Sequence, residues 1–192
     1  MKKAVILHGT GGSPEGNWFR WLESQLFTRG YQVWVPRLPL ADSPNLAEWA
    51  EYVMENSPFD IDNQTVVIGH SSGGTLAILL AAELRFARVL AIAPFIPAEE
   101  PYAATSWGPN TRLFEEIDFE KLLTQVKHSG NKISLLYSDD DPYVPEFIPE
   151  VIAEMIDAEK ILMRSQGHFN LEKSENYHHF PELEAMIIGG ER

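Results

Sequence analysis

The chain has 192 residues and a formal charge of −13, from 28 acidic and 15 basic side chains. This excess of acid argues against nucleic acid and anionic membrane surfaces as main partners, because both bind concentrated positive charge. The sequence contains no cysteine, which excludes disulfides, thiolate metal sites and cysteine nucleophiles.

From the amino terminus and the hydropathy pattern we expect no targeting signal. After Lys2 and Lys3 the apolar run covers only residues 4–7, which is too short for a secretory signal. No stretch approaches the roughly 18 apolar residues of a transmembrane helix. We therefore expect a cytoplasmic protein that folds as a single domain over residues 1–192.

Short apolar runs rich in β-branched residues predict strands along the whole chain. They lie at residues 3–7, 31–35, 65–69, 88–93, 132–138 and 159–163. Several are apolar on both faces, which is typical of parallel strands covered by helices on either side.

Amphipathic segments between these strands predict helices. The first is expected to begin at Ser13 and Pro14 and to end at Gly30. Its inward stripe consists of Trp18, Trp21, Leu22 and Leu26. Further helices are expected at 45–55, 72–84, 119–126 after an Asp118 cap, 147–156 and 181–188. This alternation predicts an α/β fold, a three-layer α/β/α sandwich with a mostly parallel central sheet of about six strands.

Residues 94–117 are the least regular part of the sequence. They include four prolines and show no clean periodicity. A long loop in a domain of this size is either functional or a surface excursion, and both interpretations stay open.

Residues 66–74, VVIGHSSGG, carry the strongest chemical signal. A serine hydroxyl is a weak nucleophile that needs an adjacent base, and a G-x-S-x-G turn between strand and helix exposes it. Ser71 occupies the serine position, and the backbone N–H of Ser72 is expected to face a developing oxyanion. Small residues also suit a purely structural turn, so this pattern needs support from elsewhere in the chain.

The support comes from two later loops. "SDDDPYVP" at 138–145 follows one predicted strand, and "RSQGHFN" at 164–170 follows the next. The carboxyl ends of parallel strands meet at one edge of a sheet, so Ser71, an aspartate and His168 are expected to converge there. A nucleophile, a carboxylate and a base in this chain order match the hydrolase arrangement.

Asp141 is the favoured aspartate because the following proline biases it towards an extended conformation. Asp139 and Asp140 could cap the turn or stay solvated. Three adjacent carboxylates also raise the possibility of calcium, but the spacing of an EF-hand is absent.

Four other histidines compete with His168 or lie near it. His178 and His179 precede the last predicted helix and are expected to be a solvated pair. His70, the variable residue of the turn, is expected to support it. His8 lies in the loop after the first strand and is a candidate for substrate contact.

That first loop, "LHGTGG" at 7–12, is expected to supply the second oxyanion donor from the backbone of Thr10 or Gly11. It is no dinucleotide-binding loop, because Pro14 stands where a third glycine is needed, and no phosphate-loop motif occurs. Trp18 and Trp107 are further candidates for an apolar substrate pocket, although Trp18 also fits the core.

The motifs "HGTGG", "GHSSGG", "SDDDPYVP" and "GHF", in this order and spacing, resemble the small lidless α/β-hydrolases of the YdeN and retinoblastoma-binding-protein-nine group. The resemblance covers essentially the whole chain. It implies Ser71 as nucleophile, Asp141 as acid and His168 as base, and it implies that no large helical lid is present.

The expected function is that of a carboxylesterase-like serine hydrolase. It would cleave an ester or amide-like acyl bond of a small or exposed substrate through an acyl-enzyme, with no cofactor and no metal. Two alternatives stay open: a hydrolase-fold module that binds a protein partner, and an acyltransferase or thioesterase using the same residues.

Overall fold

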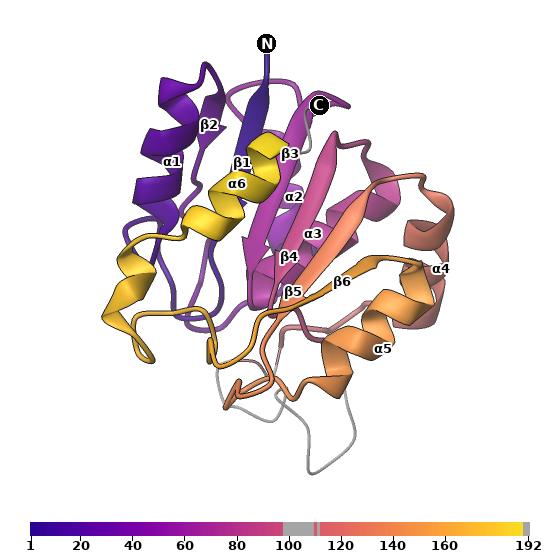
Figure 1. The fold of residues 1–192 in the computed structure, drawn as a ribbon. Coiled ribbons are helices and arrows are strands. Elements are labelled where there is room, and N and C mark those ends of the chain that lie inside the picture. Colours follow the sequence, from indigo (N-terminus) through magenta and orange to yellow (C-terminus); the bar gives the residue numbers. More distant parts are fainter. Residues whose placement is uncertain (98–109, 111, 190–192) are drawn as a thin grey trace.

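The centre of the molecule is a sheet of six parallel strands (Figure 1), seen in a computed structural model that describes residues 1–97, 110 and 112–189. The strands are β1 (Lys3–Leu7), β2 (Gln32–Trp34), β3 (Thr65–His70), β4 (Arg88–Ile92), β5 (Ile133–Tyr137) and β6 (Glu159–Leu162). Their order across the sheet is β2-β1-β3-β4-β5-β6. All six predicted strands are present, and the predicted fold class is confirmed.

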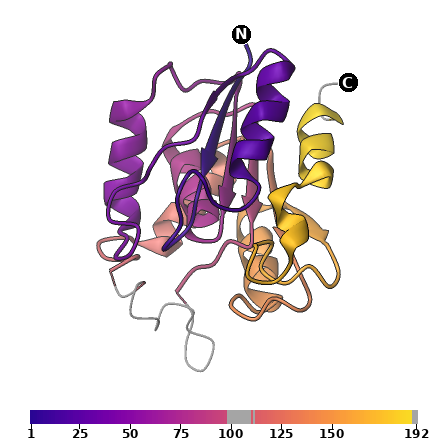
Figure 2. The same cartoon turned by 90° about the vertical axis from the view of Figure 1, so that its left-hand side faces the viewer.

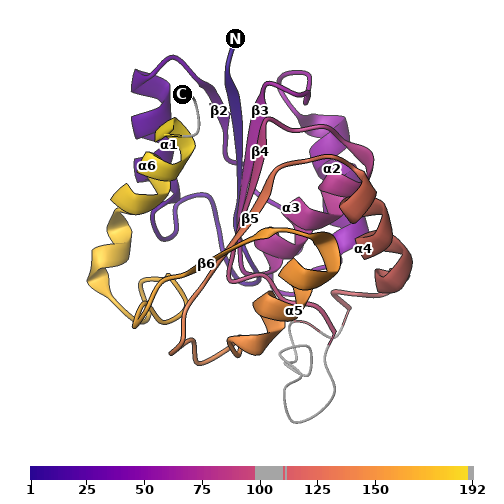
Figure 3. The same cartoon turned by 45° about the vertical axis from the view of Figure 1, so that its right-hand side comes forward.

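Helices cover both faces of this sheet. They are α1 (Phe19–Thr28), α2 (Leu46–Asn56), α3 (Ser72–Glu83), α4 (Phe119–His128), α5 (Phe147–Ile156) and α6 (Pro181–Gly189). Figure 3 shows the three layers, with α1 and α6 on one side of the sheet and the other four helices on the opposite side.

Two hydrophobic cores follow from this layering. Side chains alternate along β1, so that Val5 and Leu7 pack into the core under α2 to α5, while Ala4 and Ile6 pack into the core under α1 and α6. Figure 2 shows α1 and α6 side by side, and the second of these cores lies between them and the sheet. Burial on both faces explains why the central strands are apolar throughout.

The strand order reverses beside β1, because β2 lies on one side of it and β3 on the other. In open α/β sheets, ligands bind beyond the carboxyl ends of the strands at such a switch point. The loop after β1 and the turn after β3 therefore meet at the lower end of the sheet in Figure 1.

The start of α1 differs from the sequence prediction. Residues 13–16 form a turn in which the Gly16 N–H donates to the Ser13 carbonyl, and Asn17 has φ of 46°. A positive φ is incompatible with a right-handed helix, so α1 begins at Phe19 and not at Ser13.

Most of the irregular segment 94–117, including Trp107, lies outside the described residues, so the expected absence of a lid stays a prediction. Among residues 1–97, 110 and 112–189, no helix is both long and apolar enough to cross a bilayer.

Candidate active site

Ser71 stands at the turn between β3 and α3 with an unusual backbone conformation. Its φ is 58° and its ψ is −126°, a region that L-residues rarely adopt and that costs on the order of 1–3 kcal/mol. Its N–H donates to the Ile92 carbonyl at 2.8 Å, and its carbonyl accepts from the N–H groups of Gly74 and Thr75. The strained turn is thus held from β4 on one side and from α3 on the other.

The glycines of this turn allow backbones to approach one another. A Cβ on Gly69 would collide with the backbone of Gly73, well inside 3.0 Å. A Cβ on Gly73 would collide with the carbonyl groups of Leu7 and His8 in the first loop. Both positions therefore require glycine for packing between main chains.

His168 and Asp141 form a short hydrogen-bonded pair in the same region. The His168 Nδ1 is 2.7 Å from the Asp141 Oδ2, and the two side chains are only 7% and 1% exposed. The other carboxylate oxygen accepts from the N–H groups of Tyr143 at 2.8 Å and Val144 at 3.0 Å. With the carboxylate fixed in this way, the Nδ1 carries the hydrogen and the Nε2 is the ring nitrogen without one.

Asp139 and Asp140 hold the main chain of the loop that carries His168. The Asp139 Oδ1 accepts from the Ser165 N–H at 2.8 Å, and the Asp140 Oδ1 accepts from the Gly167 N–H at 2.6 Å. Hydrogen bonds from the Ser138 hydroxyl and the Gly167 N–H keep the pKa of Asp140 below its usual value.

Each of the three consecutive aspartates therefore bonds a different point of the facing loop. In the part of the chain that the structure describes, no group of three histidine or acidic side chains could hold a metal ion. Hydrogen bonds to the loop at 164–170 account for the three adjacent aspartates without a bound calcium ion. Sequence reasoning missed the roles of Asp139 and Asp140, although their proximity to Asp141 was a usable signal.

The first loop lies directly against Ser71. A Cβ on Gly9 would approach the Ser71 Cβ to 2.9 Å. The Thr10 N–H donates to the Ser72 hydroxyl at 2.8 Å, and the Thr10 hydroxyl donates to the Asn110 Oδ1 at 2.7 Å. The turn at residues 69–73, called the elbow below, and the first loop are thus joined through the side chain of Ser72, a contact that the sequence analysis did not anticipate.

Two backbone N–H groups expected as oxyanion donors are engaged within the protein. The Gly11 N–H donates to the Ala41 carbonyl at 2.7 Å, which ties it to another loop. The Thr10 N–H is shared with the Ser72 hydroxyl, beside Ser71. The backbone N–H of Ser72 belongs to the first turn of α3, where N–H groups have no partner within the helix.

His8 and Trp18 are structural residues in this arrangement, which corrects the expectation that they contact substrate. His8 is fully buried, accepts from the Leu38 N–H through Nε2 at 3.1 Å and donates through Nδ1 to the Gly9 carbonyl. Burial lowers its pKa. Trp18 is also fully buried, and its indole N–H donates to the Phe169 carbonyl at 3.2 Å.

A cavity of about 440 Å³ opens between the first loop, the elbow and the two later loops. Ser71 and His168 both line it, and Asp141, which bonds the His168 imidazole, is not part of the lining. Its wall includes apolar side chains from Phe19, Phe95 and Val144 and polar ones from Asn17, Asn110, Tyr143, Asn170 and Glu172. His178 and His179 lie elsewhere, exposed before α6.

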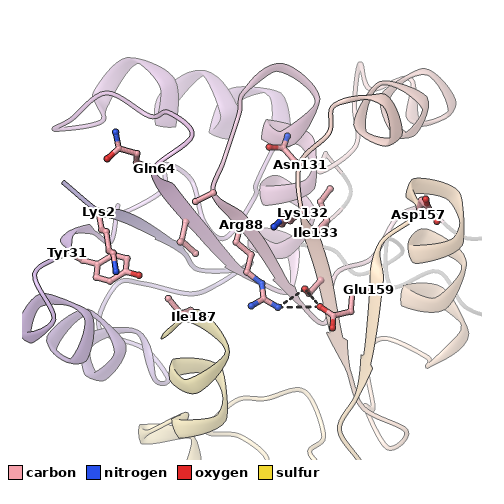
Figure 4. Close-up of a pocket in the computed structure, with 13 residues that line it drawn as sticks. Lys2, Tyr31, Gln64, Arg88, Asn131, Lys132, Ile133, Asp157, Glu159 and Ile187 are labelled. Atoms are coloured by element: carbon pink, nitrogen blue, oxygen red, sulfur yellow. Dashed lines mark hydrogen bonds and ion pairs between the residues drawn. The ribbon is translucent and has the colours of Figure 1, made fainter. Parts of the chain in front are cut away.

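A larger cavity of about 760 Å³ lies at the amino-terminal ends of the strands (Figure 4). Its most prominent group, the Arg88 guanidinium, donates to the Ser134 hydroxyl and to the Glu159 carboxylate, and it also bonds the Met186 carbonyl. The hydrogen bonds of the Arg88 guanidinium are therefore made within the protein. The cavity is remote from the elbow, so the smaller one is the candidate active site.

The six-stranded parallel sheet with helices on both faces is a minimal α/β-hydrolase fold. Residues 4–188 match the family model described as Serine hydrolase, and the chain belongs to that family. The resemblance to the YdeN and retinoblastoma-binding-protein-nine group is confirmed by the relatives found.

Serine hydrolase RBBP9 of Rattus norvegicus is 24% identical over 170 residues, which are 87% of each chain. The ydeN gene product of B. subtilis superposes with a TM-score of 0.80 at 20% identity, over 99% of this chain and 98% of that one. Est1E of Butyrivibrio proteoclasticus, solved with ferulic acid bound, superposes with a TM-score of 0.69 at 16% identity, over 98% and 86% of the two chains. Both structures share the fold of this chain.

Proposed function

We propose that this protein hydrolyses ester or amide-like acyl bonds of small or exposed substrates, with Ser71 as nucleophile, His168 as base and Asp141 as the orienting acid. The observation that carries the proposal is the 2.7 Å bond between the His168 Nδ1 and the Asp141 Oδ2, beside a cavity that His168 and Ser71 both line. Membership of the serine hydrolase family supports the same chemistry.

The reaction has two steps. The His168 Nε2 takes the proton of the Ser71 hydroxyl as its oxygen bonds the substrate carbonyl carbon, and the imidazolium then returns that proton to the leaving group. Water, activated by the same imidazole, releases the acyl group from Ser71. Asp141 holds the imidazole in the reactive tautomer and stabilises its protonated form.

Stabilisation of the oxyanion is assigned to the N–H groups of Ser72 and Thr10. Ser72 lies at the start of α3, where the helix dipole favours negative charge. The Thr10 N–H would have to be shared between the substrate oxygen and the Ser72 hydroxyl, which it bonds in the free protein. Gly11 is not assigned as an oxyanion donor because its N–H already donates to the Ala41 carbonyl.

The cavity also favours a class of substrate. Glu172 is the one aspartate, glutamate, lysine or arginine in the described lining, so no lysine or arginine there neutralises a carboxylate on the substrate. A volume of about 440 Å³ is at the small end of ligand pockets. We infer that short, uncharged acyl groups are preferred.

A series of p-nitrophenyl esters tests this proposal. Each methylene buried in the cavity contributes about 0.8 kcal/mol, so kcat/KM should rise about fourfold per carbon from acetate until the cavity is filled, and then stop rising. Ser71→Ala should reduce every rate in the series to the uncatalysed background. The matched control is Ser24→Ala on the exposed face of α1, which should behave as wild type. Undiminished hydrolysis by Ser71→Ala would refute the mechanism, and a steady rise up to dodecanoate would refute the substrate class.

A further inference from the structure

His70 stands between Gly69 and Ser71, yet its ring contacts the loop of the proposed base. Its Nε2 is 2.7 Å from the main-chain carbonyl oxygen of His168, and the side chain is 5% exposed. A carbonyl oxygen can only accept, so the Nε2 of His70 carries the hydrogen. The bond joins residues that are 98 positions apart in the chain.

The surroundings keep the His70 ring uncharged. Burial, and secondly the neighbouring His168, lower the pKa of His70 to about 3. The ring therefore stays neutral at any pH at which an imidazole base is active. It acts as a fixed hydrogen-bond donor, not as a second base.

The next carbonyl of the same loop is held in the same way. The Trp18 indole N–H donates to the Phe169 carbonyl at 3.2 Å, so two ring donors, one from the N-cap of α1 and one from the end of β3, hold two consecutive peptide units. Phe169 has φ of 54°, a conformation that costs an aromatic residue energy and persists only where its surroundings impose it.

These contacts fix a part of the site that Asp141 does not control. The Asp141 carboxylate determines how the His168 ring is rotated, through its Nδ1. The distance from the ring to Ser71 also depends on where the His168 main chain lies. The His70 bond sets that position from the residue adjoining Ser71, with the two histidine ring centroids 4.9 Å apart.

We propose that His70 is a positioning residue, whose Nε2–H holds the His168 main chain so that the imidazole reaches the Ser71 hydroxyl. The proposal rests on the proposed function, because it assumes that His168 is the base for Ser71. A misplacement of about 1 Å of a reacting group can cost on the order of 100-fold in rate, so a single hydrogen bond at this point has a large effect on turnover.

The test compares His70→Phe with His70→Gln. Phenylalanine keeps a planar ring of similar size without the donor, while glutamine places an amide N–H at a reach close to that of the Nε2. For His70→Phe we expect kcat, and the rate constant for labelling by a fluorophosphonate, to fall about 10- to 100-fold, with KM within about threefold of wild type. His70→Gln should recover most of both rates.

The readouts separate this inference from a purely structural role and from the proposed function. If folded His70→Phe turns over and labels like wild type, the positioning role is wrong, whatever its melting temperature. If glutamine fails to rescue while both variants are folded, the donor is not what matters and the inference is also overturned. If wild type itself is never labelled, the proposed function fails first.

A measurement on the wild-type protein covers the case in which neither variant folds. Nitrogen-15 NMR of the histidine rings should show His70 neutral, with the hydrogen on Nε2, from pH 5 to pH 9. A ring with its hydrogen on Nδ1, or one that titrates in this range, would contradict the bond on which the inference depends.

Discussion

Replacing Asp141 by asparagine should lower kcat about 10⁴-fold and leave the fold intact. Asparagine has the same shape, and its carbonyl oxygen can still accept from the Tyr143 and Val144 N–H groups. Its NH₂ group then faces the His168 Nδ1, which must become an acceptor. The hydrogen moves to Nε2, and the imidazole can no longer take a proton from Ser71.

Steady-state kinetics and the urea midpoint check this prediction together. The matched control is Asp118→Asn, which changes the N-cap of α4 to an equally good cap far from the cavity. That control should keep wild-type kcat. If Asp141→Asn retains more than about a tenth of wild-type kcat while its unfolding midpoint is unchanged, Asp141 is not the orienting acid.

The second large effect is expected at the elbow, where Gly69→Ala should abolish activity and destabilise the protein. The added methyl group would overlap the backbone of Gly73, and no flexible side chain is available to move away. Overpacking of this kind costs about 1–3 kcal/mol or more, and it forces Ser71 out of its strained conformation.

Denaturant unfolding and ester hydrolysis of the purified variant check the elbow prediction. Gly189→Ala, at the last residue of α6, is the control because a Cβ there meets, among the described residues, no atom beyond its own stretch of helix within 4 Å. It should match wild type in both measurements. A Gly69→Ala protein with wild-type stability and activity would show that this turn does not need close backbone contact.

The fold could be predicted from the sequence because its signals are local. Strands buried on both faces leave uninterrupted apolar runs, and β3 and β4 were recognised for that reason. Amphipathic stripes and caps such as Asp118 predict the later helices close to their observed bounds. The start of α1 was missed because Ser13 and Pro14 imitate a helix start, while the decisive feature is the positive φ of Asn17.

The candidate site was predictable only in part, for a physical reason. Ser71, Asp141 and His168 could be selected because each lies just after a strand, and topology brings such loops together. Contacts between loops leave no local pattern. The partner of His70 is 98 residues away, and the bond between Thr10 and Ser72 spans 62 residues. His8 and Trp18 were misjudged as substrate contacts because burial depends on such distant neighbours.

The most direct test of the central claim is the location of a fluorophosphonate adduct by peptide mass spectrometry. The label should be found on Ser71 in the native protein, and it should be absent from Ser71→Ala and from protein unfolded before labelling. Pretreatment with a short-chain ester that forms a long-lived acyl-enzyme should block it. A native protein that is not labelled, or one labelled on Ser72 instead of Ser71, would contradict the account.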